Sequence, residues 1–71
     1  MGELNNRVRE YRARDRLSQQ ELAERIGASR QTIALIERGD YSPSVVLALK
    51  IAGVFGAEVE TIFWINNEES D

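Results

Sequence analysis

The 71-residue sequence contains neither cysteine nor histidine. These absences exclude disulfides, zinc sites of the usual Cys/His kind, thiol nucleophiles and Ser/His proton relays. No stretch approaches the roughly 20 apolar residues that span a bilayer, and the opening MGELNNRVRE is too polar for a signal peptide. We therefore expect one cytoplasmic domain over residues 1–71. We expect no enzymatic activity, metal, cofactor, small-molecule ligand or membrane partner.

Positive charge is scarce overall but concentrated in one half of the chain. The net charge is −3, yet residues 5–38 hold eight arginines against five acidic residues. Residues 39–71 hold one lysine against six acidic residues, several of them in a tail at about 66–71. This asymmetry fits a basic face for a polyanion and an acidic end kept away from it. Ordinary solvated helix surface explains the charges equally well.

Apolar residues recur at helical spacing along most of the chain, and strict alternation is absent, which predicts an all-α fold. Leu4, Val8 and Tyr11 are expected to share one face of the first helix. In the fourth helix, Val45 is expected to point inward with Ala48, Ile51, Ala52 and Phe55. Five helices are predicted, at about 5–15, 19–26, 30–38, 45–55 and 59–63.

The second and third predicted helices have clear start and stop signals. The stretch SQQE is a capping box, in which Ser18 and Glu21 bond to each other's backbone amides. Gly27 is placed to end the second helix in the left-handed conformation. Ser29 caps the third helix and Gly39 ends it. Two short helices joined by so tight a turn must cross at a steep angle.

The third predicted helix has two chemically different faces. Ile33 and Ile36 fall together on a helical wheel and define the face expected to be buried. The opposite side carries an amide, two guanidinium groups and small or apolar side chains, which are groups that read base edges in a major groove. These outer residues are Arg30, Gln31, Ala34, Leu35 and Arg38.

The stretch LSQQELAERIGASRQTIALIERGDYSPS resembles the helix-turn-helix of Xre-type, lambda-repressor-like transcriptional regulators, and the resemblance extends to about Phe63. It implies a five-helix DNA-binding domain whose helix-turn-helix spans about 18–38. The helix from Arg30 to Arg38 would be the recognition helix. By the resemblance, Arg30, Gln31, Thr32 and Leu35 take the positions that contact bases.

Other matching positions imply contacts with the DNA backbone. Gln19 starts the preceding helix, where the family binds a phosphate at the positive helix end. Arg38, Tyr41 and Ser42 are further candidates. Asp40 departs from the family's basic residue at this place and should repel DNA.

One pair of charges has a structural role in the family. Arg12 and Glu37 match positions that form a buried ion pair between the first helix and the recognition helix.

Several of these residues have a second interpretation. Thr32 can bond to local backbone, Leu35 can be an exposed or partly buried leucine, and Arg38 can complement the end of its helix. The remaining arginines of the first helix and the turn after it are treated as electrostatic background: Arg7, Arg9, Arg14 and Arg16.

The C-terminal third has more apolar side chains than one small core needs, which is typical of an interface. We predict a homodimer formed through the fifth helix and the FWIN segment, with the fourth helix as an optional addition; Val46, Phe63, Trp64 and Ile65 are the predicted contact residues. In the alternative, Trp64 folds back as the last core residue.

We conclude from the sequence that the chain is a sequence-specific regulator that binds double-stranded DNA as a dimer on a pseudo-palindromic operator. Within that class, it could be an antitoxin or the controller protein of a restriction system. Outside it, the chain could be a protein-interaction module that has lost DNA binding, for which Asp40 and the net negative charge are the best evidence.

Overall fold

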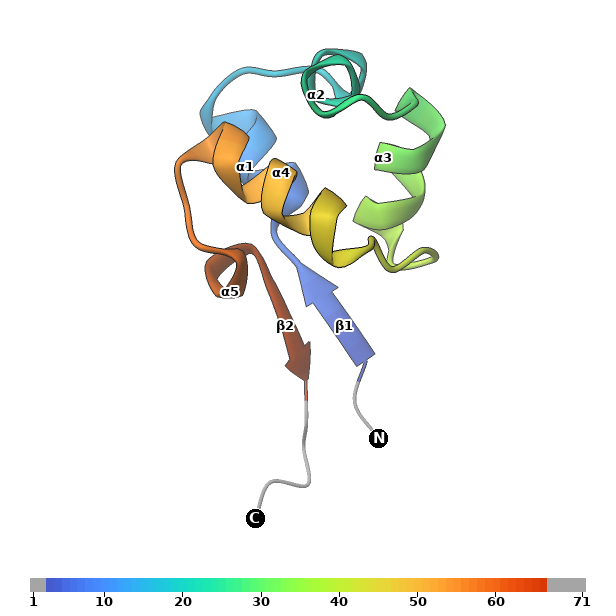
Figure 1. The fold of residues 1–71 in the computed structure, drawn as a ribbon, viewed down its shortest axis with the longest axis vertical. Helices are drawn as coiled ribbons and strands as arrows, with labels where there is room; N and C mark the ends of the chain where they lie inside the picture. Colours follow the sequence, from blue (N-terminus) through green and yellow to red (C-terminus); the bar gives the residue numbers. More distant parts are fainter. Residues whose placement is uncertain (1–2, 67–71) are drawn as a thin grey trace.

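The structure, a computed structural model, describes residues 3–66 (Figure 1). Most of the predicted acidic tail, residues 67–71, lies outside this range. Five helices are flanked by two short strands. In chain order they are β1 (Glu3–Asn6), α1 (Val8–Arg14), α2 (Gln19–Ile26), α3 (Arg30–Arg38), α4 (Val45–Phe55), α5 (Val59–Ile62) and β2 (Phe63–Asn66).

The end signals of α2 and α3 are confirmed. Ser18 Oγ accepts from the Glu21 amide at 2.9 Å, and Glu21 Oε1 accepts from the Ser18 amide at 2.8 Å, so the capping box is complete. Ser29 Oγ accepts from the Thr32 amide at the start of α3. Gly27 and Gly39 end the two helices with φ of 74° and 83°, where a side chain would be strained. Because both helices have strong local ends, their bounds follow the sequence closely.

The first helix begins three residues later than predicted. Residues before it run as β1, and the side chain of Asn6 accepts a hydrogen bond from the Val8 amide at 3.1 Å. The Arg7 amide donates to the carbonyl of Ile62 at 2.9 Å. The chain is therefore held extended by partners at the other end of the sequence, and Leu4 belongs to a strand and not to α1.

The two strands form an antiparallel pair that periodicity did not predict. Leu4 pairs with Ile65, and Asn6 pairs with Phe63, so Phe63 lies in β2 and not in the fifth helix. Figure 1 shows the pair projecting from one end of the helical body, with β1 and β2 side by side. The fold is still mainly helical, and the sheet is a small addition to it.

The core lies where the helices converge. Its largest fully buried side chains are Val8, Leu22, Ile33, Ile36, Ile51 and Ile62. Val45 was expected to point inward, but it is 76% exposed. Because α4 is apolar on most sides, a helical wheel alone does not show which of its apolar residues meet the core.

Among the described residues, no helix has the length and apolar character needed to cross a membrane.

Candidate nucleic-acid interface

The central element of the candidate interface is α3, and its inner face fixes its position. Ile33 and Ile36 are buried in the hydrophobic core, where α3 packs against α2. A tight turn of Gly27, Ala28 and Ser29 joins α2 to α3, which makes the two helices cross steeply (Figure 1). The helix is thereby docked by its apolar side, and its opposite side is left to solvent.

The outer face of α3 presents the expected polar groups. Arg30 and Gln31 are exposed at the beginning of the helix, and Ala34 and Leu35 are half-buried one turn further on. The hydroxyl of Thr32 lies 2.9 Å from that of Ser29, so it takes part in the local capping contacts. Arg30 and Gln31 are thus the polar side chains that α3 offers most openly at its N-terminal end.

A network of hydrogen bonds ties α1, α2 and α3 together beside this face. Arg12 Nε donates to Glu37 Oε2 at 2.6 Å, and Arg12 Nη2 donates to Glu37 Oε1 at 3.2 Å. Gln19 Nε2 donates to the same Oε1 at 3.1 Å, and Arg12 Nη1 donates to the Leu17 carbonyl at 2.9 Å. The Glu37 side chain is only 6% exposed. The hydrogen bonds that Arg12 donates to Glu37 also raise the pKa of Arg12 above its ordinary value.

This network decides how two of the candidate residues are used. The guanidinium of Arg12 donates hydrogen bonds to Glu37 and to the Leu17 carbonyl, so Arg12 holds α1 against α3. Gln19 has its amide nitrogen bonded to Glu37, which fixes the side chain at the start of α2. The backbone amides at that helix start, with their partial positive charge, are next to it.

In the turn after α3, the negative charge of Asp40 is paired with Arg38. Arg38 Nη2 donates to Asp40 Oδ2 at 2.8 Å, and Arg38 Nε donates to the same oxygen at 3.1 Å. Both side chains are exposed. Arg38 therefore screens the carboxylate that was expected to repel DNA. Tyr41 and Ser42 follow in an exposed loop that leads to α4.

Asn6 is a supporting residue that sequence reasoning missed. Its Nδ2 donates to the carbonyl of Ile36 in the last turn of α3 at 2.9 Å, and its Oδ1 accepts from the Val8 amide. One side chain thus joins β1, the start of α1 and the end of α3. Nothing in the local sequence marks this contact, because its partners are thirty residues apart.

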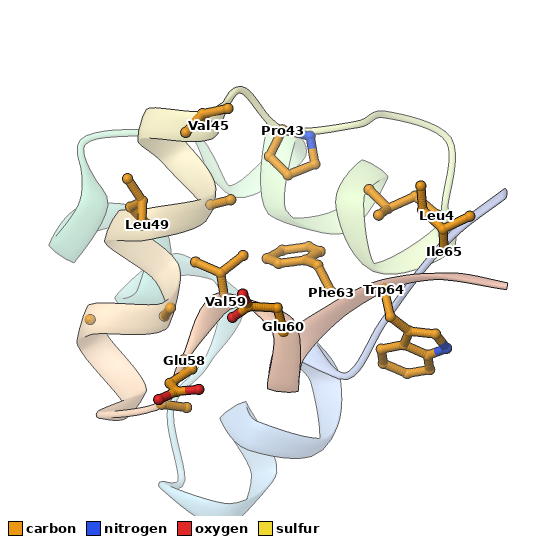
Figure 2. A pocket seen from close by; sticks show the side chains of 14 residues that line it. Leu4, Pro43, Val45, Leu49, Glu58, Val59, Glu60, Phe63, Trp64 and Ile65 are labelled. Carbon is orange, nitrogen blue, oxygen red and sulfur yellow. The ribbon is translucent and has the colours of Figure 1, made fainter. Parts of the chain in front are cut away.

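On another side of the molecule, an open apolar groove of about 750 Å³ runs between α4, α5 and the two strands. Figure 2 shows the ring of Phe63 directed into the groove, with Val45 and Leu49 of α4 along it and Leu4 and Ile65 from the strands beyond.

The four residues predicted for a dimer contact differ in accessibility. Ile65 is 63% exposed, whereas Phe63 is only 6% exposed and packs in the core. Trp64 is half-buried, and the guanidinium of Arg7 lies 4.6 Å from the centre of its ring. Val46 is exposed on α4 but does not line the groove.

Comparison with known proteins agrees with this geometry. The family described as Helix-turn-helix (HTH_3) matches residues 8–62. The HTH-type transcriptional regulator YgzD of Bacillus subtilis is 49% identical over 65 residues, which cover 92% of this chain and 98% of that protein. The restriction-modification controller protein C.AhdI of Aeromonas hydrophila has a similar structure, with a TM-score of 0.70 and 36% identity over 75% of this chain and 80% of that one. A Bacteroides fragilis protein shares the fold at a TM-score of 0.77 and 23% identity, covering 86% of this chain and 98% of that one.

A docked helix with an exposed polar face, following a tight turn from a capped helix, defines a DNA-binding protein of the helix-turn-helix class. The chain belongs to the Helix-turn-helix (HTH_3) family, the Xre-like group of transcriptional regulators.

Proposed function

We propose that this regulator reads a specific duplex sequence with the N-terminal half of α3 inserted in the major groove. The observation that carries the proposal is the exposure of Arg30 and Gln31 at the start of a helix whose other side is fully docked. Arginine suits the O6 and N7 acceptors of guanine, and glutamine suits adenine. Leu35, half-buried one turn on, is the candidate for contact with a thymine methyl group.

In this proposal the DNA backbone is held on both sides of α3. Gln19 and the free amides at the start of α2 face a phosphate of one DNA strand. Arg38, Tyr41 and Ser42 face the backbone of the other DNA strand. Thr32 serves mainly the cap of α3, since its hydroxyl lies against Ser29. The Arg12–Glu37 pair, with Gln19 bonded to Glu37, fixes α1, α2 and α3 relative to one another and so holds the proposed contact residues in place.

We further propose that the protein acts as a homodimer, with the apolar groove covered by a second copy. The groove joins exposed apolar side chains from α4 and β2, among them Val45, Leu49 and Ile65. Such contiguous apolar surface is costly to leave in water on a small domain. A two-fold dimer would place two recognition helices about 34 Å apart, on successive major grooves of one side of the duplex.

The direct test is selection of bound sequences from a random duplex library, repeated with Gln31→Ala and Arg30→Ala. We expect the wild type to enrich a two-fold symmetric motif, and each variant to lose preference at one position per half-site, at a cost of about 1–3 kcal/mol for that base.

Gln20→Ala is the matched control for Gln31→Ala, because Gln20 is an exposed glutamine whose amide is bonded to Glu24 on α2. It should leave the selected motif unchanged. If the wild type enriches no motif at all, the proposal is wrong, and a protein-interaction role becomes the better explanation of the fold.

A further inference from the structure

A small polar hollow of about 310 Å³ lies between α1 and α3, beside the network of Arg12 and Glu37. Ala34 and Arg38 of α3 line it from one side, and Gln19 closes it at the start of α2. Arg9 of α1 lines it as well. Because Gln19 and Arg38 already belong to the proposed interface, the hollow opens on the side of the molecule that would face DNA.

Most of the charge around the hollow is already paired. Glu37 accepts three hydrogen bonds, two from Arg12 and one from Gln19, so its carboxylate is satisfied within the protein. Arg12 is bonded to Glu37 and to the Leu17 carbonyl, and Arg38 forms an exposed ion pair with Asp40.

Arg9 differs from the other two arginines around the hollow. It is exposed, and among residues 3–66 it takes part in none of the four ion pairs. Its guanidinium is therefore available to an external anion, with the neutralised Glu37 offering little repulsion.

We propose that Arg9 binds a phosphate of the DNA backbone at this hollow, next to the phosphate held at Gln19. The inference rests on the proposed DNA-binding function, and it adds a contact from α1 to those of the helix-turn-helix itself. Guanidinium groups bind phosphate oxygens with two parallel hydrogen bonds, and backbone phosphates border the major groove that α3 would enter. Arg9 thereby acts on affinity and register, while base selection stays with Arg30 and Gln31.

The test measures binding of duplex DNA as a function of salt concentration for the wild type, Arg9→Ala and Arg25→Ala. Arg25 is the matched control, since it is also an exposed arginine, but it lies on α2 near the carboxylates of Asp15 and Glu21 and does not line the hollow. For Arg9→Ala we expect affinity to fall roughly three- to tenfold at 0.1 M salt, with a slope of log K against log salt shallower by about one unit. The loss should be the same on the selected operator and on an unrelated duplex, because a phosphate contact carries no base information.

Three outcomes separate the possibilities. If the wild type binds DNA but Arg9→Ala keeps the wild-type slope, the Arg9 contact is wrong while the proposed function stands. An equal change of slope in Arg25→Ala would also overturn it, because the effect would then be general charge. If the wild type binds no duplex at any salt concentration, the proposed function itself fails. Thermal unfolding followed by circular dichroism checks that Arg9→Ala is folded, and Arg9→Lys should retain most of the salt slope, because the charge is kept.

Discussion

Arg16 has a backbone conformation that most residues avoid. Its φ is 58°, in the left-handed region, and it forms the turn between α1 and the capping box of α2. An L-residue in this region pays about 1 kcal/mol or more because its Cβ crowds the following carbonyl oxygen. The side chain itself is exposed. The turn therefore carries a local cost that the surrounding packing offsets.

This cost predicts that Arg16→Gly stabilises the protein. Glycine adopts positive φ without the Cβ clash, although its unfolded state is more flexible, so the net gain should be about 0.5–1 kcal/mol. Thermal unfolding should show a rise in Tm of a few degrees for a chain of this size. Ala13→Gly is the matched control: it places glycine at an exposed position inside α1 and should lower stability by about 1 kcal/mol. A lower Tm for Arg16→Gly would show that the arginine side chain contributes more than its backbone costs.

At the scale of whole elements, the sequence predicted the helices whose ends are decided locally. Ser18, Gly27, Ser29 and Gly39 act on residues within four positions of themselves, so they can be read without the fold. The strands are different. Each has only four residues, and neither ELNN nor FWIN shows a clear alternation, so their pairing depends on contact between the two ends of the chain.

In the candidate site, too, the sequence predicts what is decided locally and misses contacts between distant segments. Arg30 and Gln31 could be placed on an outer face from helical periodicity alone. The hydrogen bond from Asn6 to Ile36 and the hollow beside Arg9 could not, because they arise only when β1 or α1 packs against α3.

The capping box of α2 predicts a specific pH dependence of stability. Hydrogen bonds from the backbone amide and side chain of Ser18 lower the pKa of Glu21 below its ordinary value of 4.5. A carboxylate with a lowered folded pKa contributes stability above its unfolded pKa, and loses it as pH falls through the folded value. The contribution of Glu21 should therefore be intact at pH 7 and should decline below about pH 4.5.

Glu21→Gln isolates this contribution, because glutamine can accept the same bond from the Ser18 amide but does not titrate. We expect the variant to be slightly less stable than the wild type at pH 7, and the difference to shrink between pH 5 and pH 3 in urea titrations. Glu24→Gln is the control, since Glu24 lies on the same helix outside the capping box. A difference that stays constant with pH would mean that the charge of Glu21 has no part in the cap.

For the molecule as a whole, the two proposed surfaces divide the chain along its charge asymmetry. The DNA-facing side is built from α1, α2 and α3, which contain most of the arginines. The apolar groove is built from α4, α5 and the strands, with Glu58 and Glu60 in its lining. The net charge of −3 thus does not argue against DNA binding, because acidic residues such as Glu58 and Glu60 lie at the groove and not at α3.

The dimer proposal predicts that Ile65→Glu separates two copies without unfolding either. Ile65 is 63% exposed in the single chain, so a carboxylate there remains hydrated in the monomer, but it would be buried in a dimer formed through the groove. Light scattering should give the wild type twice the 8.1 kDa mass of one chain, and the variant a mass near that of one chain. Ala13→Glu adds the same charge to an exposed position on α1, and it should leave the mass unchanged.

Binding of DNA should follow the loss of the dimer. On a duplex with both half-sites, Ile65→Glu should bind at least tenfold more weakly than the wild type, because the second half-site no longer adds to the affinity of the first. On a duplex with one half-site, the two proteins should bind almost equally, since α3 is unchanged. A wild-type mass near 8 kDa at all concentrations, or equal losses on both duplexes, would show that the groove is not the surface that joins two copies.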